Sequence, residues 1–305
     1  MIQHFKVGEE DAGIRIDRYL SDQYQEVSRS YLQKLLKEEM VLVAGKPVKS
    51  NYKVNTGDGI QISVPEAVEP EIEAEEMDLD ILYEDKDIII INKPKGMVVH
   101  PAAGHYSGTL VNGLMAHCRQ DLSGINGVMR PGIVHRIDMD TTGVLVVCKN
   151  DVAHNSIAAQ LKSHSITRKY YAIVHGRVKE GEGTINAPIG RHPVDRKKMS
   201  INEKNGREAV THYKVLEHFK QFTYVECQLE TGRTHQIRVH MASMGHPLLG
   251  DTVYGPSKSP FHLQGQTLHA GVLGIIHPKT GEYMEFTAPL PDYFEELLRK
   301  LRLIY

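Results

Sequence analysis

Hydrophobic residues near the N-terminus recur first with the period of a helix and then with the period of a strand. The residues with helical spacing form two groups: Ile16, Tyr19 and Leu20, then Tyr31, Leu32, Leu35 and Leu36. Ser28 is a candidate N-cap for the second helix. The alternating residues that indicate strands are Val41, Val43, Ile60, Ile62 and Val64. We therefore expect residues 1–65 to form a small α/β unit.

The rest of the chain predicts more strands than helices. Short apolar runs that suit buried strands occupy residues 88–91, 144–147 and 172–174. Two alternating segments, 212–219 and 222–230, predict a hairpin, and helical spacing appears at 151–163 and 236–244. Strands and helices do not follow a βαβ rhythm. We therefore expect an α+β fold with a mixed, mainly antiparallel sheet.

Charge is distributed unevenly along the chain and indicates where two domains meet. The 305 residues carry a net charge of −2, but residues 66–85 contain ten acidic residues and no Lys or Arg. The remaining residues therefore carry a net charge of +8, which suits a phosphate-binding surface. We expect residues 66–77 to be an acidic linker between domains at 1–65 and 78–305.

Cysteine content and hydropathy indicate a cytoplasmic protein without a membrane partner. Cys118, Cys148 and Cys227 are odd in number and far apart, which argues against a disulfide framework and a CxxC metal site. The N-terminal residues include no apolar stretch of the signal-peptide type. The apolar run at residues 88–91 is far too short to span a bilayer.

The densest cluster of reactive side chains is the segment PGIVHRIDMDTTG at residues 131–143. Asp138 follows Arg136 by two positions in a loop directly before a buried strand, a rigid support that suits a nucleophile. A structural Arg–Asp pair with Thr-capped turns fits the same residues. The HRID sequence is similar to the HRD motif of protein-kinase catalytic loops, but the chain lacks GxGxxG, DFG and Walker motifs, so we reject phosphoryl transfer.

Two further segments contain side chains of the types that bind ligands or take part in catalysis. The segment LETGRTHQIRVH at residues 229–240 contains two histidines, but its spacing is not that of a metal site, so we expect no metal. Arginines at a helix start can instead hold phosphates or pair with a carboxylate. The segment RKYYA at residues 168–172, taken alone, is typical of tyrosines packed in a strand.

Taken in order, these segments resemble the pseudouridine synthase family that modifies ribosomal and transfer RNA, in the branch related to the large-subunit synthases. The resemblance covers residues 80–290 and rests on five ordered motifs, which makes it specific. The matching segments are ED at 84–85 through NKPKG at 92–96 to HP at 100–101, HRID at 135–138 with TG at 142–143, KYYA at 169–172, GRTHQIRVH at 232–240, and HPLLGD at 246–251 with YG at 254–255.

The N-terminal unit resembles an S4 RNA-binding domain. The matching segments are RIDRYL at 15–20, SRS at 28–30, the valines at 41 and 43, GKPV at 45–48, and GD at 57–58. Glu39 stands where that domain usually has glycine, and Ala44 stands where asparagine precedes the glycine. A positive φ at Glu39 would lower stability. On or beside the second helix, Arg29, Lys34 and Lys37 are expected contacts to RNA phosphates.

The resemblance implies the roles of four residues in the isomerisation of uridine. Asp138 would be the nucleophile, and Arg238 would pair with it and keep it charged. Tyr170 would stack on the uracil and take part in proton transfer, and Arg136 would fill the space that the flipped base leaves. Attack at C1′ and elimination at C2′ both remain open. The reaction involves no redox step and no group transfer, so no cofactor is implied.

The expected substrate is large-subunit (23S) ribosomal RNA, with transfer RNA as the alternative. A second class of function is a non-catalytic RNA-binding or ribosome-assembly factor that kept the fold. The set Asp138, Tyr170 and Arg238 favours the enzyme, because a pure binder needs no Arg-paired buried carboxylate. A metal-dependent nuclease or deaminase is the third and weakest interpretation.

Overall fold

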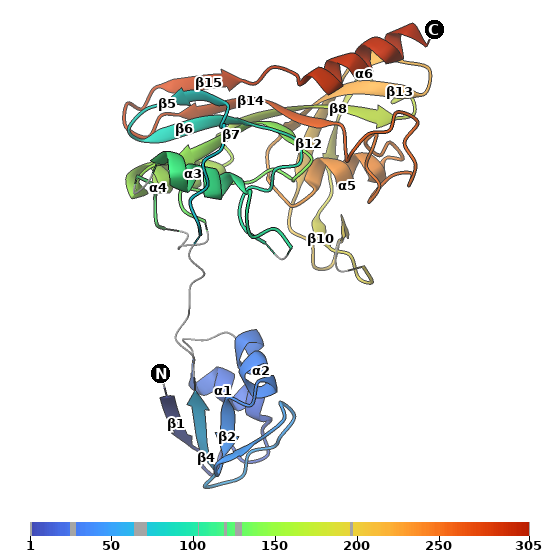
Figure 1. Cartoon of the computed structure of the whole chain (residues 1–305). Coiled ribbons are helices and arrows are strands. Elements are labelled where there is room, and N and C mark those ends of the chain that lie inside the picture. Colours follow the sequence, from blue (N-terminus) through green and yellow to red (C-terminus); the bar gives the residue numbers. More distant parts are fainter. Residues whose placement is uncertain are drawn as a thin grey trace. The chain divides into compact units, whose positions relative to one another are not determined.

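The chain consists of two compact units, residues 1–69 and 70–305, which are described separately (Figure 1). The computed structural model describes residues 2–24, 29–63, 72–102, 104–118, 121–125, 130–195 and 198–304. Of the expected linker, residues 66–71 lie outside the described ranges. Residues 72–77 belong to the second unit, where the backbone N–H of Glu75 donates to the carbonyl of Asn112 at 3.0 Å. The linker boundaries stay a prediction.

The N-terminal unit packs two helices on a four-stranded antiparallel sheet with the order β1-β4-β2-β3. Its elements are β1 (Ile2–Lys6), α1 (Ile16–Gln23), α2 (Arg29–Lys37), β2 (Val41–Val43), β3 (Lys46–Pro47) and β4 (Gly59–Ser63). The predicted apolar positions form its core, where Ile16, Leu20 and Leu32 are fully buried. The N-cap expected at Ser28 and the strand residue Val64 lie outside the described residues.

Two turns beside β2 contain non-glycine residues in the left-handed region. Glu39 has a φ of 58° and Ala44 has a φ of 48°. These are the two positions where the sequence departs from the usual S4 pattern. A left-handed conformation costs an L-residue about 1–2 kcal/mol. The burial of Val41 and Val43 between the two turns stabilises the fold and offsets this conformational cost.

The C-terminal unit is built on a nine-stranded sheet. Its order is β5-β6-β7-β14-β8-β13-β12-β9, with β15 paired to β14. The strands are β5 (Ile81–Glu84), β6 (Ile88–Lys93), β7 (Thr142–Cys148), β8 (Thr167–His175), β9 (Glu182–Asn186), β12 (Val210–His218), β13 (Phe222–Leu229), β14 (Leu268–Ile276) and β15 (Tyr283–Thr287). Pairing in this sheet is antiparallel except between β7 and β14. The expected mixed, mainly antiparallel α+β fold is confirmed.

Helices cover both faces of this sheet, which explains the continuous apolar runs in its central strands. Figure 1 shows α3 (Leu110–Cys118), α4 (Asp151–Lys162) and α5 (Gln236–Ser243) on one face and α6 (Asp292–Leu303) on the other. The four isoleucines of β6 are fully buried. A strand buried on both faces needs apolar residues at consecutive positions rather than at alternate ones. No helix within the described ranges is long and apolar enough to cross a bilayer.

Two local features place the loop before β7. Gly143, at the start of β7, has a φ of 108°, and a side chain there would collide with the backbone of Ala270 in β14. This glycine therefore allows the parallel contact between β7 and β14 that fixes the end of the loop. A short hairpin of β10 (Ile189–Arg191) and β11 (Met199–Ile201) adds a second, two-stranded sheet.

Candidate active site

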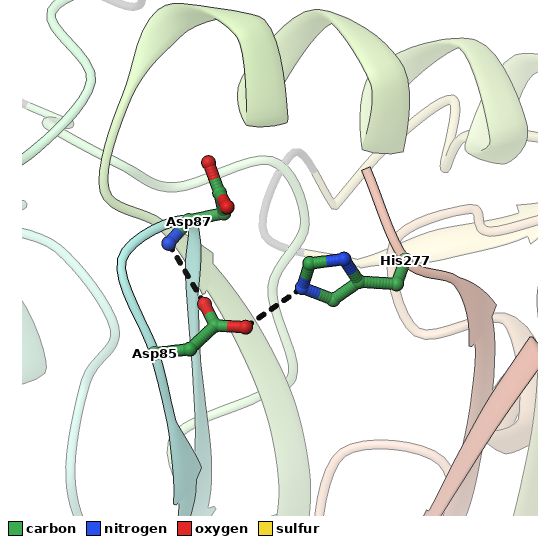
Figure 2. Close-up of side chains that lie close together, drawn as sticks. All are labelled: Asp85, Asp87 and His277. Carbon is green, nitrogen blue, oxygen red and sulfur yellow. Dashed lines mark hydrogen bonds and ion pairs between the residues drawn. The ribbon is translucent and has the colours of Figure 1, made fainter. Parts of the chain in front are cut away.

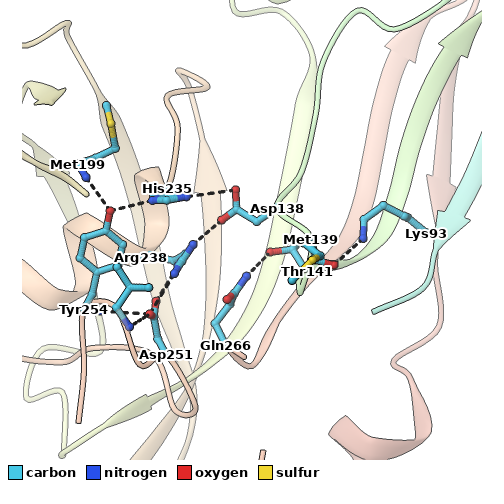
Figure 3. Close-up of polar contacts among 11 residues, drawn as sticks. Lys93, Asp138, Met139, Thr141, Met199, His235, Arg238, Asp251, Tyr254 and Gln266 are labelled. Atoms are coloured by element: carbon cyan, nitrogen blue, oxygen red, sulfur yellow. Dashed lines mark hydrogen bonds and ion pairs between the residues drawn. The ribbon is translucent and has the colours of Figure 1, made fainter. Parts of the chain in front are cut away.

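The loop that contains Asp138 is held against the end of β6 by a buried lysine. Lys93 is fully buried, and its ammonium group donates to the carbonyls of Pro94 (2.8 Å), Met97 (2.8 Å) and Met139 (3.0 Å). Burial lowers the pKa of Lys93 to about 7, against the opposing charges of nearby aspartates. Because Met139 follows Asp138 directly, Lys93 fixes the backbone beside the candidate nucleophile (Figure 3).

The other side of the loop is fixed by the segment that leads into β14. The Gln266 amide donates to Thr141 Oγ1 at 3.1 Å, and Thr142 Oγ1 shares a 2.8 Å hydrogen bond with His269 Nδ1. The backbone N–H of Thr141 donates to the carbonyl of Asp138 at 3.0 Å and closes a turn. The loop is therefore held at both ends by rigid strands, as a preorganised site requires.

Arg238 lies between two carboxylates, one at the loop and one in the protein interior (Figure 3). Its Nη1 donates to Asp138 Oδ2 at 2.9 Å, whereas Nε and Nη2 donate to Asp251 at 2.6 and 3.0 Å. Burial disfavours the charged guanidinium, but the hydrogen bonds and charges of Asp251 and Asp138 raise the pKa of Arg238 above its ordinary value. The predicted pair of Asp138 and Arg238 is brought together across 100 positions of sequence.

Asp251 holds Arg238 in this orientation. The carboxylate is 1% exposed, and its Oδ1 also accepts the backbone N–H groups of Val253 (3.0 Å) and Tyr254 (3.1 Å). A bidentate pair with a buried aspartate fixes the plane of a guanidinium. One guanidinium nitrogen, Nη1, is thereby directed toward Asp138.

His235 faces the second oxygen of Asp138. It precedes α5 with a φ of 57°, and its Nε2 lies 3.8 Å from Asp138 Oδ1. Its Nδ1 shares a 2.8 Å hydrogen bond with the Tyr254 hydroxyl, which itself accepts the backbone N–H of Met199 at 2.8 Å. From this network we assign the hydroxyl proton to the bond with Nδ1, which leaves the ring proton on Nε2. Burial lowers the pKa of His235, against the opposing charge of Asp138, and this lowering favours the neutral ring.

A cavity of about 510 Å³ opens beside Asp138. Tyr170, on β8, lines the cavity together with Leu229 and His235. The ring of Tyr170 is 8% exposed, and burial raises the pKa of its hydroxyl. Asp138, Tyr170 and Arg238 also line a smaller hollow of about 60 Å³. The three predicted catalytic residues therefore surround one site.

The predicted RNA contacts lie in different parts of the chain. Arg136 is exposed and lines the same cavity, and its Nη1 lies 3.4 Å from Nε2 of the buried His100. In the N-terminal unit, Lys37 is exposed beside a surface hollow that Lys49 also lines. Arg29 and Lys34 belong to α2, but their side chains lie outside the described residues.

The two histidines of residues 229–240 and the nearby His246 have separate hydrogen-bond partners. His235 contacts Tyr254, as described above. His240 bonds through Nδ1 to the hydroxyl of Thr211 and through Nε2 to the carbonyl of Ala187, both at 2.9 Å. His246 Nδ1 bonds to a third partner, the carbonyl of His175 at 2.9 Å. Each of the three histidines therefore bonds to partners that the other two do not share.

One other group in the described part of the chain has the composition of a metal site: Asp85, Asp87 and His277 (Figure 2). The carboxylate of Asp85 already accepts four hydrogen bonds. Its donors are the backbone N–H groups of Asp87 and Ile88, the Tyr83 hydroxyl and His277 Nε2. These bonds cap the turn between β5 and β6 and join it to the end of β14. The group lies at the end of β6 opposite Lys93.

The sequence identified Asp138, Arg238 and Tyr170, but it did not identify their supports. Asp251 and Tyr254 lie in the matching segments HPLLGD and YG, and this position in the family motifs is the sequence feature that could have identified them. His235 was considered only as a metal ligand. No pattern along the chain places Lys93 under the Asp138 loop, because the two are 45 positions apart and meet only in the sheet.

A partly exposed, arginine-paired aspartate beside a cavity, in a mixed sheet joined to a small S4-like unit, fits the class of RNA pseudouridine synthases. The chain belongs to the RNA pseudouridylate synthase family, whose model matches residues 87–243, and the S4 domain model matches residues 14–60. The expected enzyme class is thereby confirmed: the protein is an RNA pseudouridine synthase with an S4 domain.

Alignments with similar proteins cover nearly the whole chain. An RNA pseudouridine synthase of Bacillus subtilis is 58% identical, and the alignment covers 96% of both chains. Ribosomal large subunit pseudouridine synthase D of Zymomonas mobilis is 46% identical over 96% of this chain and 95% of its own. Among solved structures, human RNA pseudouridylate synthase domain containing 1 matches with a TM-score of 0.58 and 27% identity. That match covers 74% of this chain and 95% of the human one.

Proposed function

We propose that this enzyme isomerises uridines of large-subunit (23S) ribosomal RNA to pseudouridine, with Asp138 as the nucleophile. The observation that carries the proposal is the 2.9 Å bond from Arg238 to Asp138 Oδ2, with Arg238 itself anchored on the buried Asp251. This contact orients the Asp138 carboxylate and opposes the negative charge of its ionised form. Only that form attacks a sugar carbon.

The two oxygens of Asp138 have different surroundings, which supports one of them as the attacking atom. Oδ2 accepts from Arg238, whereas Oδ1 lies 3.8 Å from His235 Nε2. We infer that Oδ1 forms a bond to C1′ of the target nucleotide while the N1–C1′ bond breaks and uracil leaves as an anion. After the ring turns, C5 bonds to C1′ and expels the carboxylate, C5 loses its proton, and N1 gains one. Elimination at C2′ would use the same carboxylate as a base.

Two further residues act on the base in this proposal. Tyr170 stacks on the uracil in the cavity and takes part in proton transfer, because its ring lines both hollows beside Asp138. Arg136 enters the helix where the target base has flipped out. Its exposed position at the cavity, two residues from Asp138, supports this role. Filling the vacated stack offsets an unstacking cost of a few kcal/mol.

The RNA class is supported by the relatives and by the N-terminal unit. Relatives called ribosomal large subunit pseudouridine synthase D are 44–46% identical over nearly the whole chain. The S4 domain would bind RNA phosphates through exposed cations such as Lys37 on α2. A second RNA-binding unit raises the effective concentration of one large RNA at the active site.

The test is a map of pseudouridines across total RNA from cells that lack the protein. We expect one or more uridines of 23S ribosomal RNA to remain unmodified. Wild-type protein should restore these sites, and Asp138→Asn should not. Loss of pseudouridine in transfer RNA alone would contradict the proposed substrate, and restoration by Asp138→Asn would contradict the proposed nucleophile.

A further inference from the structure

Arg168 is a buried cation without a carboxylate partner in the described part of the chain. It lies on β8, two residues before Tyr170, and is 6% exposed. Its Nη2 donates to the carbonyl of Glu230 at 2.8 Å, whereas its buried Nε has no hydrogen-bond partner. Buried charges in proteins are normally paired, because an uncompensated charge in the interior destabilises the fold. Among the residues that the structure describes, none supplies a counter-charge to Arg168.

Arg168 lies beside Gly232, the residue directly before a second arginine. A side chain on Gly232 would place its Cβ 2.6 Å from Arg168 Nη1, so a larger residue there would force the guanidinium to shift. The next residue, Arg233, is held by a 2.9 Å bond from its Nε to the carbonyl of Glu208. Burial lowers the pKa of Arg168, Tyr170 opposes this shift, and the charge of Arg233 lowers the pKa by a further, smaller amount. The two cations lie close enough to repel each other.

Both arginines line the cavity that contains Asp138 and Tyr170. Lys162 and His164, at the end of α4, are exposed at the same cavity. Asp138 is the one acidic residue in this lining, and its charge is already opposed by Arg238. The wall formed by Arg168 and Arg233 therefore has a net positive charge that the described residues do not neutralise.

We propose that Arg168 and Arg233 form a phosphate subsite, which binds a backbone phosphate of the RNA next to the target uridine. The assignment rests on the proposed function and adds the group that orients the substrate. Guanidinium groups match the oxygens of a phosphate with paired, charge-assisted hydrogen bonds. A phosphate fixed on this wall holds the attached ribose in the cavity that Asp138 lines. Such positioning contributes directly to the rate of a displacement at C1′.

The test measures how RNA binding depends on salt, in an Asp138→Asn background where no turnover disturbs the equilibrium. The probe is a 23S ribosomal RNA transcript, and the variants are Arg168→Gln, Arg168→Lys and Arg233→Gln. Each lost phosphate contact reduces the slope of log K against log salt by about 0.7–0.9. We expect that reduction in both glutamine variants, with Kd raised about tenfold at low salt. Arg168→Lys should retain the slope.

The matched control is Arg299→Gln, which removes the charge of an exposed arginine on α6. It should leave the slope and Kd unchanged. Thermal melting shows which variants are folded, and Arg233→Gln keeps the test decisive where Arg168→Gln unfolds. A wild-type slope in folded Arg168→Gln and Arg233→Gln would overturn the subsite. Failure of the proposed function is a separate result: wild-type turnover by Asp138→Asn, or pseudouridine loss confined to transfer RNA.

Discussion

At the scale of residues, the site is built around one guanidinium shared by two aspartates with different surroundings. Asp251 is 1% exposed and accepts four hydrogen bonds, two of them from Arg238. Asp138 is partly exposed and accepts one bond from Arg238. The difference separates two tasks: the interior carboxylate fixes the arginine, and the carboxylate at the cavity keeps an oxygen available for reaction.

Replacing the interior carboxylate tests this division. We expect Asp251→Asn to lower the free energy of unfolding by about 3 kcal/mol, because Arg238 loses its buried counter-charge. The single-turnover rate should fall at least tenfold, while RNA affinity changes little, since Asp251 does not line the cavity. Urea unfolding, single-turnover kinetics and RNA binding measure the three effects. Asp292→Asn, at an exposed position, is the control, and an unchanged rate in folded Asp251→Asn would contradict the account.

The role of His235 is tested by comparing Ala and Gln at this position. Both residues meet the same left-handed backbone at φ 57°, so both lose a similar amount of stability. Gln retains an N–H donor that reaches toward Asp138, and Ala does not. We therefore expect His235→Ala to turn over about tenfold more slowly than His235→Gln, with equal melting temperatures. Equal rates in the two variants would assign His235 a purely structural role.

At the scale of elements, the sequence predicts those strands and helices that have a clear local pattern of apolar residues. The isoleucine run of β6 and the alternating pattern of β12 and β13 yield their strands, and α4 and α5 follow from helical spacing. α6 was not predicted, although Phe294, Leu297, Leu298 and Leu301 give it a clear apolar face. The hairpin β10–β11 was missed because strands of three residues are too short to show a period.

The catalytic pair could be predicted only through the resemblance. Asp138 and Arg238 are 100 positions apart, and no local pattern brings a loop before β7 to the start of α5. The same holds for Lys93, whose burial under the loop depends on the pairing of β6 with β7. Propensity and periodicity describe single elements, whereas the site depends on contacts between elements that are distant in sequence.

The turn between β5 and β6 allows a test of whether turnover requires a metal ion. The four hydrogen bonds that Asp85 accepts already stabilise this turn and join it to His277. We therefore expect turnover to survive treatment with EDTA, and Asp87→Asn to turn over like wild type. The assay is tritium release from 5-tritiated uridine RNA, with the folding of the RNA checked separately. A loss of turnover that added zinc or magnesium restores would contradict this expectation.

At the scale of the whole molecule, each unit has its own hydrophobic core. The core of the N-terminal unit consists of residues between 5 and 62, and the cores of the C-terminal unit consist of residues from 72 onward. Domains with separate cores generally fold independently. The S4 domain and the synthase domain are therefore expected to contribute separately, the first to RNA affinity and the second to chemistry.

Removing residues 1–69 tests this separation. We expect residues 70–305 to remain folded and to modify RNA more slowly when RNA is limiting. Phosphate contacts of the S4 domain release counterions, so the difference from the full chain should shrink as salt rises. Turnover over a salt series and thermal melting measure the effects. A lower melting temperature with slower turnover at every salt concentration would instead show that residues 1–69 stabilise the synthase unit.

The most direct test of the central claim is tritium release from 5-tritiated uridine RNA by Asp138→Asn. The amide keeps nearly the same shape and still accepts from Arg238, but it has no charge with which to attack the sugar. We expect no tritium release above background, with melting temperature and RNA affinity close to those of wild type. Release at the wild-type rate by a folded, RNA-binding Asp138→Asn would contradict the assignment of Asp138 as the nucleophile.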